Sequence, residues 1–121
     1  MPQSPAPVLL VDSNPDGLEL YSTALALAGI GVETANSAGD ALNHVVANPP
    51  RVMVTGLRLR GLPATDLIEN VRRTAQDDVY IVGLTTNARL ETQPARAAGC
   101  DLVLTVPCLP ETLVHELRRV L

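Results

Sequence analysis

Five short strand-like segments, four of them almost wholly apolar, constrain the fold of this chain more than any other feature. Continuous apolar runs of this length are typical of strands that are buried on both faces of a sheet. Such a sheet needs a covering layer on each side, so the longer segments between the runs are expected to be helices. The predicted strands are Val8–Val11, Gly31–Ala35, Val52–Thr55, Val79–Leu84 and Leu102–Thr105.

Helix signals occupy the gaps between these runs. Asn14 before Pro15 is typical of a helix start, because the side chain accepts a free backbone N–H and proline presets φ. Ser37 resembles the first residue of a capping box, and Gly29 is a fitting end for the first helix. The fourth helix is expected to begin no earlier than about Glu91, because Pro94 has no N–H and fits only a first turn.

The alternation of strands and helices predicts an α/β domain with a doubly wound, five-stranded parallel sheet. Residues 1–7 contain three prolines and are predicted to form a flexible N-terminal tail. Residues 8–121 are predicted to form one domain, since a chain of 121 residues can bury a single core without disulfides or metals.

Composition excludes several classes of protein. With 46% hydrophobic and 18% charged residues, the chain is not disordered. A net charge of -4 argues against a nucleic-acid-binding face, and no apolar run approaches the roughly 20 residues of a membrane span. All nine basic residues are arginines, so chemistry that needs a lysine is excluded. Two cysteines and no signal peptide favour a cytoplasmic protein.

At the strand ends the chain resembles the receiver domain of two-component response regulators, over essentially all of residues 8–121. The resemblance implies a flavodoxin-like, three-layer sandwich and a role in phosphorelay signalling. Each motif is weak alone, but their order and spacing together are specific. The motifs are Val8–Asp12 before Asn14–Asp16, Ser37–Leu42, Val82–Thr85, Ala97–Asp101 and Leu104–Pro107.

The resemblance also implies a pocket at the carboxyl ends of the strands. A working receiver has an acidic pair after the first strand that holds Mg²⁺, and a phosphoacceptor Asp at the end of the third. It has a Thr or Ser after the fourth strand, and a Lys before a cis-proline after the fifth. Here Asp12 matches the first acid, Thr85 the hydroxyl and Pro107 the proline, whose peptide bond is expected to be cis.

Three positions depart from that pattern. Ser13 stands where the second acid is expected, Gly56 where the phosphoacceptor is expected, and Val106 where the lysine is expected. Gly56 has no nucleophile for an acyl phosphate, and the loss of two carboxylates removes most oxygen ligands for Mg²⁺. We therefore expect a degenerate pseudo-receiver that is not an enzyme, with no cofactor and no metal.

Other residues near the pocket allow two interpretations each. Asp12 is either a remaining metal ligand or a residue that caps the first helix or bonds nearby backbone amides. Thr85 is either a switch hydroxyl or bonded to backbone. Thr55 is expected to point to the other face of its strand, so it is a poor surrogate phosphoacceptor.

Arg58 and Arg60 could bind an anion or a partner carboxylate, or be solvated. Solvated helix ends are expected for Arg72–Arg73 and Arg118–Arg119.

The sequence therefore predicts a phosphorylation-independent domain that binds a partner protein or a covalently linked output domain, without contacting nucleic acid or membrane. The alternative is a small-molecule site in the vacated pocket, made more apolar by Gly56 and Val106. In the family the positions of Leu102 and Leu109 are often acidic. If either leucine is exposed, we expect a homodimer or partner contact on the face made by the fourth helix, fifth strand and fifth helix.

Overall fold

The computed structural model describes residues 7–75 and 78–121. Residues 1–6 of the predicted tail therefore lie outside the described residues. Pro7 is joined to the sheet, because its carbonyl accepts hydrogen bonds from the backbone N–H groups of Arg51 (2.9 Å) and Val52 (3.0 Å). In these two ranges no helix combines the length and apolarity that crossing a membrane requires.

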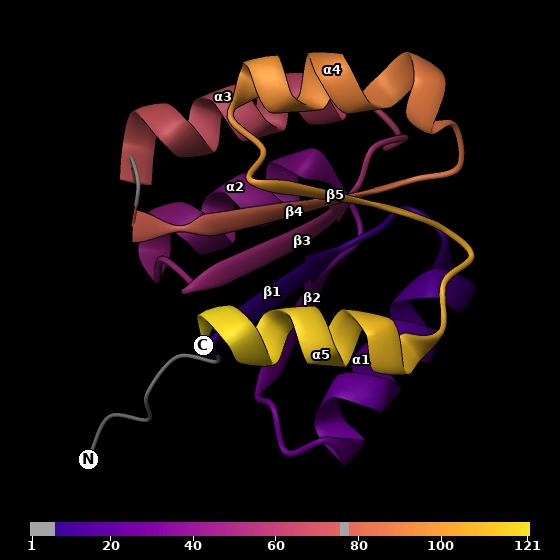
Figure 1. Ribbon diagram of the computed structural model, residues 1–121. Helices are drawn as coiled ribbons and strands as arrows, with labels where there is room; N and C mark the ends of the chain where they lie inside the picture. The colour runs from indigo at the N-terminus through magenta and orange to yellow at the C-terminus, as the bar shows by residue number, and fades with distance from the viewer. Residues whose placement is uncertain (1–6, 76–77) are drawn as a thin grey trace.

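The predicted α/β fold is confirmed, with a five-stranded sheet in the order β2-β1-β3-β4-β5 and every neighbouring pair parallel (Figure 1). The three inner strands are buried on both faces, as their apolar runs predict. β5 lies at an edge of the sheet and is only half-buried. The strands are β1 (Val8–Val11), β2 (Val32–Ala35), β3 (Val52–Gly56), β4 (Tyr80–Thr85) and β5 (Leu102–Thr105).

Five helices cover the sheet in two layers. One face is covered by α1 and α5, and the opposite face by α2, α3 and α4 (Figure 1). Alternate residues of each strand supply the two cores: Leu9 and Val11 pack toward α2–α4, whereas Val8 and Leu10 pack toward α1 and α5. The helices are α1 (Pro15–Leu27), α2 (Ala38–Ala47), α3 (Ala64–Ala75), α4 (Ala88–Ala98) and α5 (Pro110–Val120).

The predicted helix ends are confirmed at α1 and α2. The Asn14 side-chain oxygen accepts a hydrogen bond from the backbone N–H of Asp16 at 2.9 Å. The Ser37 hydroxyl accepts one from the backbone N–H of Asp40 at 3.1 Å. Gly29 follows the last residues of α1 with φ of +79°, the left-handed conformation that glycine adopts without strain.

The prediction for α4 was wrong, because this helix begins at Ala88 and contains Pro94 in its interior. Its first turn is closed by the backbone N–H groups of Leu90 and Glu91, which both donate to the carbonyl of Asn87. Pro94 removes the N–H that would reach the carbonyl four residues earlier, that of Leu90. Pro94 and Leu90 are both exposed, so the missing hydrogen bond lies at the surface of α4 and not in the core.

The prediction for Arg72 was also wrong, because its side chain lies inside the fold and is only 18% exposed. The guanidinium donates to the carbonyls of Gly99 (2.7 and 2.9 Å) and Val79 (2.6 Å), and it pairs with the Asp101 carboxylate. These acceptors lie 7 to 29 residues away in sequence, so no local pattern reveals them. Arg73 is exposed, as expected for a solvated helix end.

Candidate functional site

The residues predicted for the pocket meet at the carboxyl edge of the sheet, where parallel α/β folds place their ligands. A cavity of about 400 Å³ lies at this edge. Asp12, Gly56, Val106 and Pro107 line it. The Val106–Pro107 peptide bond is cis, as expected.

Asp12 contacts the segment that leads into α1. Its carboxylate accepts a hydrogen bond from the backbone N–H of Asn14 at 2.9 Å. Gly17 makes room for this carboxylate, since a Cβ at Gly17 would stand 2.5 Å from Asp12 Oδ2. The Asp12 carboxylate thus bonds a nearby backbone amide, whereas the N-cap of α1 is Asn14.

Gly56 ends β3 directly opposite Asp12. A Cβ built at Gly56 would stand 3.6 Å from Asp12 Oδ1, which is an ordinary contact distance. A Cβ thus fits at this position without a collision, so the glycine is not required to keep a Cβ out. The preceding residue, Thr55, is fully buried and donates its hydroxyl to the carbonyl of Gly56 at 2.9 Å.

A network that joins Thr85, Glu91 and Arg58 closes the other side of the cavity. The Thr85 hydroxyl accepts a hydrogen bond from the backbone N–H of Asn87 at 2.9 Å, and it donates to Glu91 Oε1. Glu91 Oε2 pairs with Arg58 Nε at 3.1 Å. The Thr85 side chain is 1% exposed, so this hydroxyl is committed to contacts within the chain.

Glu91 is a site residue that the sequence reasoning did not identify. It lies in the first turn of α4, and Arg58 lies in the loop after β3. Because β3 and β4 are neighbours, the segments that follow them meet at the same edge of the sheet. That topology was predictable, and an acid facing an arginine across it is the signal that could have found the pair. Arg58 does bind a carboxylate, but one from its own chain.

Two further contacts fix the loops around the cavity. The Ser13 hydroxyl accepts a hydrogen bond from the backbone N–H of Arg60 at 2.9 Å, which joins the loops after β1 and β3. Tyr21 lines the cavity, and its hydroxyl donates to the carbonyl of Cys108 at 3.4 Å. Burial, together with the neighbouring Cys108, raises the pKa of Tyr21 above its ordinary value. This hydroxyl therefore remains a neutral donor at physiological pH.

The side chains at this edge do not fit a magnesium ion. Mg²⁺ is bound through carboxylates in octahedral geometry, and the acids that line the cavity are Asp12 and Glu91. Glu91 is already neutralised by Arg58. Across residues 7–75 and 78–121 there is no group of three or more His, Cys, Asp or Glu side chains that could hold a metal. Asp12, Arg58 and Glu91 line the cavity together with the apolar side chains of Leu57, Leu84 and Val106.

The order of the strands and the position of the site define a flavodoxin-like α/β domain. The model of the response regulator receiver domain matches residues 8–118, so this chain belongs to the response regulator receiver family. The chemotaxis protein CheY4 of Vibrio cholerae has a similar structure, with a TM-score of 0.88 and 31% sequence identity. That likeness covers 96% of this chain and 98% of CheY4.

Among curated proteins, the chain is 34% identical to the transcriptional regulatory protein TrcR of Mycobacterium tuberculosis, over 98% of this chain and 46% of TrcR. It is 27% identical to the transcriptional regulatory protein KdpE of the same species, over 92% of this chain and 49% of KdpE. The chain thus spans about half the length of these relatives, and the matched half corresponds to a receiver domain.

Proposed function

We propose that this receiver domain signals without phosphorylation, by binding a partner protein or a covalently linked output domain. The observation that carries the proposal is the pair of residues that face each other at the site. Gly56 ends β3 without a side chain, and the carboxylate opposite it, that of Asp12, accepts the backbone N–H of Asn14. The family resemblance assigns the phosphoacceptor to Gly56, where no oxygen nucleophile exists to form an acyl phosphate.

The Thr85–Glu91–Arg58 network supports the same proposal. In the family, the hydroxyl at the position of Thr85 contacts the phosphoryl group. Here that hydroxyl donates to Glu91, and the charge of Glu91 is balanced by Arg58. These bonds tie the start of α4 to the ends of β3 and β4 without an added anion. On this basis we infer that the domain holds one conformation and that its signal is set by partner availability.

The face made by α4, β5 and α5 is the surface that we propose for the partner. Leu109, just before α5, is 70% exposed. β5 lies between these helices as a half-buried edge strand. Leu102 is half-buried and packs against the core beneath α1 and α5, so Leu109 carries the proposed contact.

Incubation with Mg²⁺ and acetyl phosphate is expected to add no phosphoryl group to the intact protein. The physical reason is the absence of a carboxylate nucleophile at Gly56. Beryllofluoride, which mimics a phosphoryl group, should leave the amide NMR spectrum unchanged for the same reason. Intact-mass spectrometry and two-dimensional amide spectra provide the two measurements.

The matched control restores, in the same chain, the two acids and the lysine that the family resemblance places at these positions. The triple variant Ser13→Asp, Gly56→Asp, Val106→Lys is expected to gain a single phosphoryl adduct, because Gly56 has space for a side chain next to Asp12. A phosphoryl adduct on the unmodified protein would contradict the proposal, and peptide mapping would identify the acceptor.

A further inference from the structure

The cavity at the carboxyl edge of the sheet combines a carboxylate with an apolar wall. Its volume of about 400 Å³ falls within the range of small-molecule sites, roughly 300–1,000 Å³. The carboxylate is that of Asp12, which follows β1. The apolar wall is formed at the ends of β3, β4 and β5 by Leu57, Leu84, Val106 and Pro107.

Asp12 carries the one charge in this cavity that the chain does not balance. Glu91 and Arg58 also line the cavity, but they form an ion pair with each other, with Nε to Oε2 at 3.1 Å. Asp12 accepts the backbone N–H of Asn14, which is a neutral donor. In the part of the chain that the structure describes, no arginine or histidine forms an ion pair with Asp12. The lining therefore attracts a cation and repels an anion.

The space beside this carboxylate suits a compact donor group, because Gly56 carries no side chain. A Cβ at Gly56 would stand 3.6 Å from Asp12 Oδ1 and 3.8 Å from the carbonyl oxygen of Val11. A group that lies just above Gly56 therefore has two acceptor oxygens within reach. An ammonium is compact and has three donors, whereas a guanidinium is a wider, planar fork. The position thus favours a primary ammonium.

We propose that this cavity binds a small organic monocation, a primary ammonium on a hydrocarbon body. The ammonium lies over Gly56 and donates to the Asp12 carboxylate, and the hydrocarbon body packs against Leu84 and Val106. The inference goes beyond the proposed function, because partner binding through Leu109 does not require this ligand. Failure of either proposal therefore leaves the other intact.

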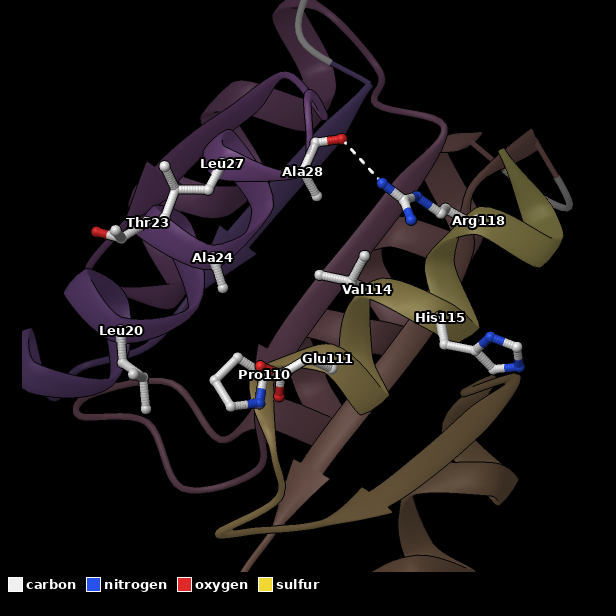
Figure 2. A pocket seen from close by; sticks show the side chains of 10 residues that line it. All are labelled: Leu20, Thr23, Ala24, Leu27, Ala28, Pro110, Glu111, Val114, His115 and Arg118. Atoms are coloured by element: carbon white, nitrogen blue, oxygen red, sulfur yellow. Dashed lines mark hydrogen bonds between the residues drawn. The ribbon is translucent and has the colours of Figure 1, made fainter.

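A second hollow, of about 570 Å³, lies between α1 and α5 and provides a control (Figure 2). It is lined by an acid, Glu111, and by a base, Arg118, so these two charges cancel. Arg118 also donates to the carbonyl of Ala28 at 3.1 Å, as the dashed line in Figure 2 shows. This groove selects no ligand charge, in contrast to the cavity beside Asp12.

Three probes with the same ring separate charge from shape: benzylammonium, benzyl alcohol and benzoate. In two-dimensional amide NMR of the unmodified chain, benzylammonium is expected to bind with a Kd of about 1 mM, the usual order for a fragment. It should shift the amide signals of Gly56, Leu57 and Val106. Benzyl alcohol should bind about ten-fold more weakly, and benzoate more weakly still. Equal binding of the ammonium and the alcohol, or no binding of the ammonium, would overturn the proposal.

Asp12→Asn tests the carboxylate on the protein side. Asparagine keeps the size of the side chain and an oxygen that accepts the Asn14 N–H, but it removes the charge. The Kd of benzylammonium should therefore rise about ten-fold or more. The matched control is Glu111→Gln, which removes an acid from the groove between α1 and α5 (Figure 2) and should leave the Kd unchanged.

Circular dichroism verifies that both variants are folded. If Asp12→Asn binds benzylammonium as tightly as the unmodified chain, the ammonium does not contact Asp12. If both variants weaken binding equally, the probe responds to the net charge of the chain and not to this cavity. Either result overturns the proposal. The comparison of the three probes needs no variant, so it decides the proposal even where Asp12→Asn does not fold.

Discussion

Replacing Arg72 by methionine is expected to lower the free energy of unfolding by about 3 kcal/mol. Methionine keeps much of the length of the side chain but removes every donor. The carbonyls of Val79 and Gly99 then lose charged hydrogen bonds, and the Asp101 carboxylate loses its cation. Asp101 also accepts the backbone N–H of Ile81 at 2.8 Å, so the loss weakens the junction of α3, β4 and β5.

Urea unfolding followed by circular dichroism measures this loss, which corresponds to a fall in Tm of about 10 °C. Arg73→Met is the matched control, because Arg73 is the next residue on α3 and is exposed. Its effect should stay within about 0.5 kcal/mol, the usual range for surface positions. Equal stabilities of the two variants would show that the guanidinium contributes no more than a solvated helix end.

Much of the fold was predictable because its signals are local. Apolar runs identified the strands, and short-range caps such as Asn14 and Ser37 identified the starts of α1 and α2. The failures share a cause. Pro94 lies inside α4 at an exposed position, and Arg72 is largely buried because distant carbonyls surround it. Neither solvent exposure nor distant acceptors can be derived from the residues next to a position.

The residues of the candidate site also fall into those that local signals predict and one that they do not. Asp12, Gly56 and Thr85 follow or end strands, so their location at one edge of the sheet was predictable from the alternation of strands and helices, although Thr85 does not line the cavity. Glu91 was missed because its partner Arg58 lies 33 residues away in sequence, so no local pattern joins the two. The two residues meet because the segments that follow β3 and β4 lie at the same edge of the sheet.

Replacing Gly99 by alanine is expected to lower the free energy of unfolding by about 4 kcal/mol, through two separate effects. Gly99 has φ of +124°, where any residue with a Cβ is strained. The new Cβ would also stand 2.6 Å from Cγ of Arg72. That side chain cannot move aside freely, because its guanidinium is bonded to the carbonyls of Gly99 and Val79.

A comparison with Gly29 separates strain from collision. Gly29 also has a positive φ, of +79°, but a Cβ there would meet nothing within 4 Å. Gly29→Ala should therefore cost only the backbone strain, about 1–2 kcal/mol. Urea unfolding of both single variants gives the difference. If Gly29→Ala costs as much as Gly99→Ala, the contact with Arg72 contributes nothing.

A double-mutant cycle tests whether the part of the Gly99→Ala destabilisation that exceeds backbone strain comes from the contact with Arg72. Arg72→Ala removes the atoms that a Cβ at residue 99 would strike, so Gly99→Ala in that background should cost about as much as Gly29→Ala. The expected coupling between positions 72 and 99 is about 2 kcal/mol, within the range for residues in contact. Additive effects would mean that the Arg72 stem moves without losing its hydrogen bonds. Coupling of the expected size would establish that Gly99 is required mainly because Arg72 lies against its Cα.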